Sequence, residues 1–508
     1  MNAPVEAPNP YGRLPLEGEG PVDPQRQREV VARLRTLLPE HCVLFREEDT
    51  RPYECDGLTL YRQLPLAVVL PESEAQVVAI VKLCREMGVP IVPRGAGTGL
   101  SGGALPHAAG VLLSTAKLNR IVRLDAAARM AVVEPGARNL AITDAAAPFG
   151  LYYAPDPSSQ IACTIAGNVA ENSGGVHCLK YGLTFHNILA VRGVTGEGDL
   201  VEFGSAAPDV PGLDLLALVI GSEGMLCVVT EVTVKLVPKP QLARCIMASF
   251  GDVSTAGEAV AAIIAAGIIP AGLEMMDQPA TRMVEPFVKA GYDLDAAAIL
   301  LVESDGTPAE VDEEIARMTE VLNRAGAKKI AVSNSETERL RFWKGRKNAF
   351  PAAGRVSPAY YCMDGTIPRK RLGEMLRAIQ QMEGKYGLRC PNVFHAGDGN
   401  LHPLILFNDN DVEEVKRAED FGVEILELSV ALGGTITGEH GVGVEKISQM
   451  CSQFSDAERA MFHAVKRAFD PAGILNPAKA IPTLHRCAEY GRMKVSGGRL
   501  PFADLERF

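Results

Sequence analysis

The sequence contains no apolar run of the roughly 20 residues that a membrane-spanning helix needs. The nearest candidate, residues 259–272, is shorter and is interrupted by Pro270, so we expect a buried helix there. The N-terminus is rich in proline and acidic residues and lacks the basic region and apolar run of a signal peptide. These absences predict a cytoplasmic protein without a transmembrane segment, whose first residues form a loose arm.

Closely spaced cysteine pairs and an excess of positive charge are also absent. None of the 11 cysteines belongs to a C-x-x-C pair, which leaves the chain without an evident iron–sulfur cluster or structural zinc site of its own. Their scattered positions favour free thiols in a reducing cytosol. The net charge of −11 argues against nucleic acid as a partner.

The length of 508 residues exceeds what one hydrophobic core supports, so we expect several domains. Short strands and helices alternate up to a proline-flanked boundary at residues 237–241. Beyond it, longer helices separate strands such as residues 296–304 and 402–407, which predicts an α+β domain with an antiparallel sheet. We therefore divide the chain into an N-terminal arm (1–50), a first domain (51–240), a second domain (241–440) and a C-terminal helical segment (441–508).

The helix expected at residues 73–88 illustrates how sharply some elements are marked. Ser73 and Gln76 form a capping-box pattern, an apolar stripe follows, and Gly88 supplies the stop.

A glycine-rich loop, RGAGTGLSGGA at residues 94–104, follows a predicted strand. Its G-x-G-x-x-G pattern at residues 97–102 matches the dinucleotide fingerprint, but that motif must open a helix, and a proline and a glycine soon after it prevent one. A loop between two strands instead exposes bare amide groups that suit an anion, above all a pyrophosphate. The alternative is a glycine-rich turn that binds no ligand.

Two further segments of this kind lie downstream, PDPSSQIACTIAGNVAENSGG at residues 155–175 and GSEG at residues 221–224. Three such turns in one domain suggest a single extended ligand lying across it.

Together with the tail segment DPAGILNPAK, these turns follow the order found in the vanillyl-alcohol-oxidase (VAO) superfamily, and the chain resembles its p-cresol methylhydroxylase (PCMH)-type FAD-binding domain. The resemblance implies an α+β fold with a two-subdomain PCMH/VAO-type domain, non-covalent FAD, and a C-terminal segment that returns to the FAD. It implies a pyrophosphate site at Arg94, Gly95, Ala96, Gly97, Thr98, Gly99, Leu100 and Ser101. The isoalloxazine would lie against Ser158, Ser159, Gly167, Asn168 and Asn172, the adenosine side near Glu223 and Gly224, and Asn476 over the flavin. Further cofactor-binding residues are Pro93, Pro155, Asp156 and Gly175.

Two histidines flank an Asp-Gly pair at residues 398–399. Because Asp-Gly favours a two-residue type I′ hairpin, His395 and His402 would pair directly across the strands, with Cβ atoms about 5 Å apart on one face. Two imidazoles so placed suit a divalent metal. Glu439, in the glycine-flanked turn TITGEHGVG, could complete a two-His, one-Glu site with open positions for substrate. The alternative is a structural hairpin with two partly exposed histidines.

The segment FWKGRKNAF at residues 342–350 is dense in cations, and Arg346 or Lys347 could bind a substrate carboxylate, although an isolated arginine is more often a surface charge. WKGRKNAF, HAGDGNLH and GEHGVG together resemble the FAD-linked 2-hydroxy-acid dehydrogenases, and most of all the FAD-linked subunit of bacterial glycolate oxidases. The 2-hydroxyglutarate relatives have a lysine where this sequence has Cys362, so we expect a small monocarboxylate as substrate.

The resemblance implies FAD-dependent, metal-assisted oxidation of a small 2-hydroxy acid to the 2-oxo acid, glycolate to glyoxylate. His395, His402 and Glu439 would hold the metal, which is expected to be zinc, with manganese or iron as alternatives. Arg346 would bind the substrate carboxylate, and His440 would act as general base while a hydride passes to the flavin.

The electrons would then pass to a protein partner rather than to NAD. The resemblance implies a second FAD-domain subunit and an iron–sulfur subunit of a glycolate oxidase complex, peripheral on the cytoplasmic face of the inner membrane. The alternatives are a stand-alone D-lactate dehydrogenase, an oxygen-using oxidase and a non-catalytic flavoprotein scaffold subunit.

Overall fold

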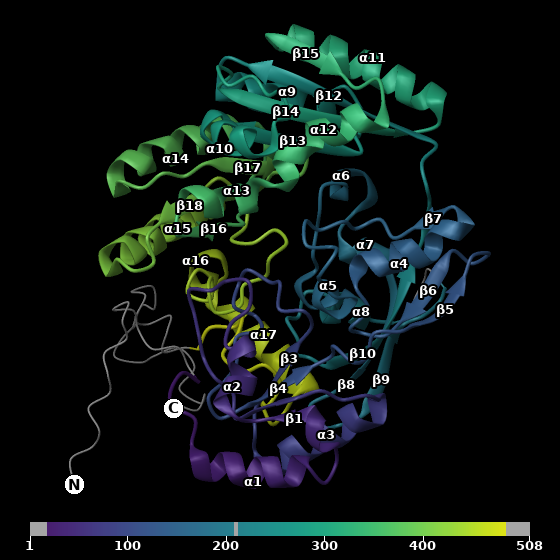
Figure 1. Ribbon diagram of the computed structural model, residues 1–508, viewed down its shortest axis with the longest axis vertical. Coiled ribbons are helices and arrows are strands. Elements are labelled where there is room, and N and C mark those ends of the chain that lie inside the picture. Colours follow the sequence, from purple (N-terminus) through teal and green to yellow (C-terminus); the bar gives the residue numbers. More distant parts are fainter. Residues whose placement is uncertain (1–17, 208–211, 484–508) are drawn as a thin grey trace.

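The computed structural model describes residues 18–207 and 212–483. In Figure 1 the first part of the chain, purple to blue, forms the lower half of the molecule, and the teal and green segment forms the upper half. The yellow C-terminal segment returns to the lower half, where α17 (Asp456–Phe469) lies among the first strands. Mixed helices and sheets in this arrangement confirm the predicted α+β class.

A four-stranded sheet of order β1-β2-β4-β3 opens the lower half, and only its β1–β2 pair is antiparallel. The C-terminal segment joins this sheet, because Leu475 bridges to Ile91 in parallel. The strands are β1 (Val43–Leu44), β2 (Ala67–Val69), β3 (Ile91–Arg94) and β4 (Val111–Ser114), and the helices are α1 (Pro24–Leu34), α2 (Glu47–Thr50) and α3 (Glu74–Met87).

Part of the segment expected to be an arm is folded. The α1 residues Val30, Val31 and Leu34 are buried in the same hydrophobic cluster as the apolar face of α3. Residues 24–50 therefore differ from the prediction, because an amphipathic helix and a short strand complete this sheet. Residues 1–17 of the predicted arm, and residues 484–508 of the predicted C-terminal segment, lie outside the described residues.

A five-stranded antiparallel sheet of order β5-β6-β10-β8-β9 forms the second subdomain of the lower half. A two-stranded pair, β7 and β11, stands beside it. The strands are β5 (Ile121–Asp125), β6 (Met130–Val133), β7 (Leu151–Tyr152), β8 (Ile188–Val194), β9 (Leu200–Gly204), β10 (Val228–Lys235) and β11 (Val237–Pro238). The helices are α4 (Asn139–Ala146), α5 (Ile165–Glu171), α6 (Cys178–Tyr181), α7 (Thr184–Asn187) and α8 (Leu215–Val219).

The upper half is built on a seven-stranded sheet of order β15-β12-β14-β13-β17-β18-β16, in which every pair is antiparallel, as predicted. Its strands are β12 (Leu242–Phe250), β13 (Gly272–Asp277), β14 (Ala298–Gly306), β15 (Lys329–Val332), β16 (Ala359–Cys362), β17 (Asn392–His395) and β18 (Asn400–Phe407).

Helices cover both faces of this sheet, which explains why its strands are apolar almost throughout. Side chains of α9 (Val253–Ala265), α11 (Pro308–Arg324), α14 (Leu372–Tyr386) and α15 (Val412–Ala431) share one core with one face. Side chains of α10 (Gln278–Val288), α12 (Glu336–Lys347) and α13 (Ala349–Val356) share a second core with the other. The buried helix predicted at residues 259–272 is present as α9, but it begins earlier and ends at Ala265, and residues 266–272 are not helical. The short helix α16 (Met450–Gln453) precedes α17.

The β17–β18 hairpin differs from the prediction. Its loop has four residues, 396–399, so that His395 pairs with Asn400 and His402 pairs with Val393. A two-residue type I′ turn needs positive φ at both central residues, whereas only Gly399 has it, at φ 80°. Because the register shifts by two residues, both histidines remain on one face, as diagonal rather than direct neighbours.

None of the helices within residues 18–207 and 212–483 combines the length and the apolar character needed to cross a bilayer. Nine cysteines of these ranges have free thiols.

Candidate active site

One cavity of about 390 Å³ receives residues from both halves of the molecule. The predicted residues that line it are Pro93, Arg94, Gly95, Ala96, Gly97, Thr98, Gly99, Leu100, Ser158, Ser159, Gly167, Asn168, Glu223, Gly224, Arg346, His395, His402, Glu439 and His440. The structure thus brings the glycine-rich turns of the first half and the histidine cluster of the second into one wall.

The remaining predicted residues support this wall instead of lining it. The side chain of Asn476 donates to the carbonyl oxygens of Gly103 (2.9 Å) and Glu223 (2.6 Å), and the backbone oxygen of Ser101 accepts from two amides of the C-terminal segment. Asn172 ends α5 with φ 51°. Pro155, Asp156 and Gly175 are not among the residues that line the cavity, and Asp156 contacts His177 (Oδ2–Nδ1 2.8 Å).

The glycine loop after β3 fits an anionic ligand. Within the described part of the chain, the amide groups of residues 95–99 donate no hydrogen bond to protein, although these residues line the cavity. Gly97 has φ 71°, and a methyl group there would lie 2.1 Å from Arg94 Nη2. The Arg94 side chain is itself held back by a 2.6 Å bond to the Cys55 carbonyl oxygen. Bare amides on a fixed loop form the kind of concavity that binds a phosphate.

The histidine pair converges on one carboxylate oxygen. Nε2 of His395 lies 3.2 Å and Nε2 of His402 lies 2.9 Å from Oε1 of Glu439, and the two imidazole centroids are 5.0 Å apart. Burial opposes ionisation of Glu439, but the two imidazoles hold its pKa well below the usual range. Two imidazole nitrogens and a carboxylate oxygen are a donor set that divalent zinc, manganese or iron accepts.

A buried glutamate, Glu274 of β13, fixes two of the predicted site residues. One of its oxygens accepts from Nδ1 of His395 (2.7 Å) and the other from Nε of Arg346 (2.6 Å). Burial opposes a charge on His395, but Glu274 and Glu439 raise its pKa well above the usual value. Arg346 is 2% exposed and is therefore a paired internal cation in the cavity wall, with Lys347 beside it.

The turn that carries Glu439 and His440 is wrapped around a second buried carboxylate, Asp364. Its oxygens accept from the amides of Gly438, Glu439 and His440, at 2.9 to 3.3 Å, and from two side chains. Burial opposes ionisation of Asp364, but His440 and Lys446 lower its pKa. Asp364 therefore sets the backbone of this turn and has few lone pairs left for a metal.

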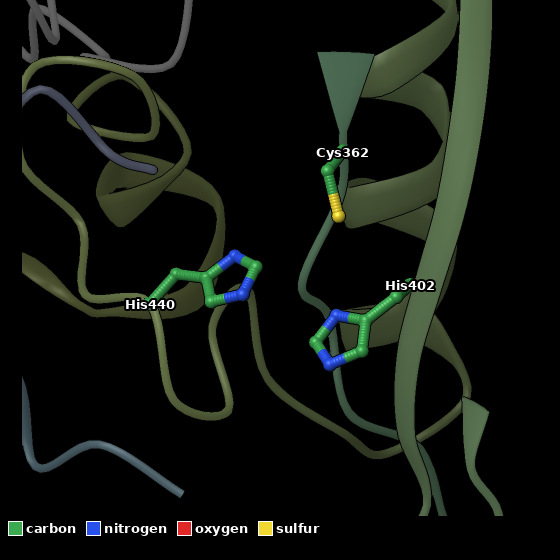
Figure 2. A group of neighbouring side chains, drawn as sticks. All are labelled: Cys362, His402 and His440. Carbon is green, nitrogen blue, oxygen red and sulfur yellow. The ribbon is translucent and has the colours of Figure 1, made fainter. Parts of the chain in front are cut away.

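His440 stacks on His402 with 4.9 Å between ring centroids and 10° between planes. Its Nε2 lies 3.9 Å from Oε1 of Glu439, whereas its Nδ1 is buried without a hydrogen-bond partner in the described residues. Burial lowers the pKa of His440 to about 4, so the ring is neutral at neutral pH. Figure 2 shows that the side chain of Cys362, at the end of β16, points toward the rings of His402 and His440.

Two family models match the chain, the "FAD binding domain" over residues 65–204 and "FAD linked oxidases, C-terminal domain" over residues 239–480. The chain is 59% identical over 479 residues to glycolate oxidase subunit GlcD of Escherichia coli (strain K12), covering 94% of this chain and 96% of that protein. The chain belongs to the FAD-linked oxidases. The resemblance drawn from the sequence is confirmed.

This FAD-linked oxidase is also 30% identical over 461 residues to a D-lactate dehydrogenase of Anaerostipes hadrus, covering 89% of this chain and 97% of that protein. Among solved structures, p-cresol methylhydroxylase with substrate bound superposes with a TM-score of 0.79 at 20% identity, covering 91% of this chain and 98% of the other. That likeness shows the fold alone, and it confirms the predicted PCMH-type FAD-binding domain.

Sequence reasoning missed several residues of the oxidase's site. Glu274 and Asp364 hold its predicted residues, and Asp56 and Glu171 add carboxylates to the cavity wall. Glu274 lies within the buried strand β13, and Asp364 follows the end of β16 by two residues. Because a buried carboxylate needs partners, such acids are a usable signal.

Proposed function

We propose that this FAD-linked oxidase oxidises a small 2-hydroxy acid, glycolate, to the 2-oxo acid glyoxylate. The observation that carries the proposal is the convergence of His395 and His402 on one oxygen of Glu439, in the wall of a cavity that also presents the bare amides of residues 95–99. Identity of 59% with a glycolate oxidase subunit, against 30% with a D-lactate dehydrogenase, supports glycolate over lactate.

We assign FAD to the glycine-rich side of the cavity and a divalent metal, zinc in the first instance, to His395, His402 and Glu439. The amides of residues 95–99 would bind the pyrophosphate, and FAD supplies the hydride acceptor. A metal at the histidine pair supplies polarisation of the substrate hydroxyl. The imidazoles of His395 and His402 both contact Glu439, so the three ligands are already gathered.

The chain's own residues perform the remaining tasks. Lys347 and Arg346, cations of the cavity wall, bind and orient the substrate carboxylate, while Glu274 holds the Arg346 guanidinium by its Nε. His440 accepts the hydroxyl proton at Nε2, the ring nitrogen that lies beside Glu439. Stacking on His402 fixes the plane of that ring. Burial of the cluster excludes water from the proton transfer.

For reoxidation we propose a second FAD-domain subunit and an iron–sulfur subunit, assembled with this chain on the cytoplasmic face of the inner membrane. The absence of closely spaced cysteine pairs supports an external acceptor, because this chain offers no cluster ligands in that pattern. The word "subunit" in the name of the Escherichia coli relative also supports an assembly.

The test is anaerobic flavin reduction by a panel of glycolate, D-lactate and L-lactate. Glycolate should bleach the flavin absorbance fastest, whereas a faster reaction with D-lactate would identify a D-lactate dehydrogenase. Treatment with a chelator should abolish reduction, and added zinc should restore it. If no 2-hydroxy acid bleaches the flavin, the chain is a scaffold subunit.

Replacement of the base separates chemistry from cofactor binding. His440→Ala should slow flavin reduction by about 10²- to 10⁴-fold while the protein keeps its FAD. His463→Ala is the matched control, because His463 is a half-buried histidine of α17 that does not line the cavity. Unchanged reduction by the His440 variant would remove that residue as the base.

A further inference from the structure

A buried thiol, that of Cys362, lies beside two members of the histidine cluster. Cys362 ends β16, and its Sγ can be grouped with one ring nitrogen each of His402 and His440, all within 4.8 Å of one another. Figure 2 shows the sulfur and both rings directed toward a common space. Cys362 is 4% exposed and His402 is 2% exposed, so this space is internal.

The thiol group differs from the set that the proposed function uses. His402 contacts Glu439 through Nε2, whereas its Nδ1, on the other ring edge, lies 3.4 Å from the Met363 carbonyl oxygen. His440 brings a buried Nδ1 that has no hydrogen-bond partner in the described residues. An unpartnered imidazole nitrogen beside a thiol is an unfilled coordination position.

The described residues contain one other group of potential metal ligands that includes a thiol, and a lysine ammonium already contacts it. His41, Cys42 and Glu72 also gather three potential ligand atoms. There, however, the Lys117 ammonium contacts Sγ of Cys42 at 3.2 Å and Oε1 of Glu72 at 2.6 Å. A side-chain cation already occupies that surface group, and we assign no ion to it.

We propose that Cys362, His402 and His440 form a second metal position, which takes a thiophilic divalent cation such as cadmium or excess zinc. One thiolate and two imidazoles are ligands that such ions prefer. On binding, the Sγ–H bond breaks, an Sγ–metal bond forms, and the thiol proton leaves to solvent, with no change of oxidation state. Where the first position is already filled through Nε2 of His402, the Nδ1 proton of that ring also leaves to solvent, and the ring bridges the two cations. The three ligand atoms lie within 4.8 Å of one another and must approach further when the ion binds.

Occupation of this position withdraws His440 from catalysis. An imidazole that gives one nitrogen to a cation carries its proton on the other, so it cannot accept the proton of a substrate hydroxyl. The cation is therefore an inhibitor, and this consequence alone rests on the proposed function. Binding of the ion does not depend on what the enzyme oxidises.

The experiment is a titration of the FAD-loaded protein with cadmium chloride, followed as the thiolate-to-cadmium charge-transfer band in ultraviolet difference spectra. Wild type should develop the band, and Cys362→Ser should lose it. The cadmium affinity of the Cys362→Ser protein should fall by at least about tenfold, because even the loss of a residue that only contacts a metal ligand lowers metal affinity by that factor. Cys245→Ser is the matched control, because the thiols of Cys245 and Cys362 are both buried and each contacts the carbonyl oxygen of the following residue.

Two further variants separate the two metal positions. Glu439→Gln removes a ligand of the first position only, so the band should remain, whereas His440→Ala should weaken cadmium binding. The proposal is wrong if Cys362→Ser keeps the band, if Cys245→Ser loses it, or if Glu439→Gln abolishes it. Should Cys362→Ser fail to fold, the Glu439 and His440 variants decide the question. A wild-type band in a protein that no 2-hydroxy acid reduces would refute the proposed function and leave the second position intact.

Discussion

Replacing Glu274 by glutamine tests the link between the internal ion pair and the proposed metal position. The carboxylate accepts from Nδ1 of His395 with one oxygen and from Nε of Arg346 with the other. An amide offers one acceptor and one donor, so the glutamine can satisfy His395 or Arg346 but must direct an N–H group at the remaining donor. Glu274→Gln therefore removes one charge-assisted hydrogen bond and leaves a buried guanidinium without its counter-charge.

Two separate losses follow from this geometry. A carboxylate behind a metal-binding histidine is typically worth about 10- to 100-fold in metal affinity, or about 1.4 to 2.8 kcal/mol. Removing one partner of a buried ion pair costs about 3 to 5 kcal/mol of folding stability. We expect Glu274→Gln to bind zinc about 10- to 100-fold more weakly than wild type and to unfold at a lower urea concentration.

The assay is isothermal titration of the metal-stripped, FAD-loaded protein with zinc, paired with urea unfolding. Glu303→Gln is the matched control: Glu303 lies on the neighbouring strand, is 2% exposed, and accepts from both Arg339 and His177. The Glu303→Gln protein should lose comparable stability but keep the zinc affinity of wild type, because neither Arg339 nor His177 has a hydrogen bond or ion pair with Glu439 in the described structure. Equal zinc affinities in Glu274→Gln and wild type would refute the reasoning, as would an equal loss in the Glu303 variant.

Two other consequences can be measured directly. Gly97→Ala should weaken FAD binding by tenfold or more in fluorescence titrations, because φ is 71° and the methyl group would meet Arg94. Gly88→Ala is the control, because Gly88 has φ 62° but open space around it. This variant should lose about 1 to 2 kcal/mol of stability and keep its FAD affinity. Equal FAD affinities in the two variants would refute the prediction. Burial raises the pKa of Asp277 to about 6, so the folded state keeps a proton that the unfolded state releases. Stability should therefore fall as the pH rises from about 4 to about 6, by about 3 kcal/mol, and Asp277→Asn should flatten this slope in urea midpoints measured across that range. A slope unchanged by the substitution would contradict the assignment.

Elements fixed by local chemistry could be predicted from the sequence. Helix α3 begins after Ser73, whose hydroxyl accepts from the Gln76 amide, and ends at Gly88 in the left-handed conformation, as expected from the pattern. The antiparallel sheet of the second half followed equally from apolar strands between long helices. In both cases, the interactions that decide the structure lie within a few residues of one another.

The hairpin register could not be predicted in this way. The Asp398-Gly399 pair favours a two-residue turn, but the Gly399 carbonyl oxygen accepts from the Ile367 amide at 3.0 Å. That contact, from a segment 32 residues earlier (399 − 367), supports the four-residue loop. The prediction that His395 and His402 lie on the same face of the hairpin is confirmed, because a register shift of two residues preserves the side-chain alternation.

Distant contacts also fix the segment that carries Glu439 and His440. Glu223, in a turn of the FAD-binding half, accepts from the amides of Val442 and Gly443 at 2.7 Å each. Asp364 holds the preceding residues of the same segment from the sheet of the other half. Residues 438–443, which include Glu439 and His440, are therefore held by two buried carboxylates, one from each half of the molecule. Because Glu439 and His440 line the cavity, its wall depends on contacts with both halves.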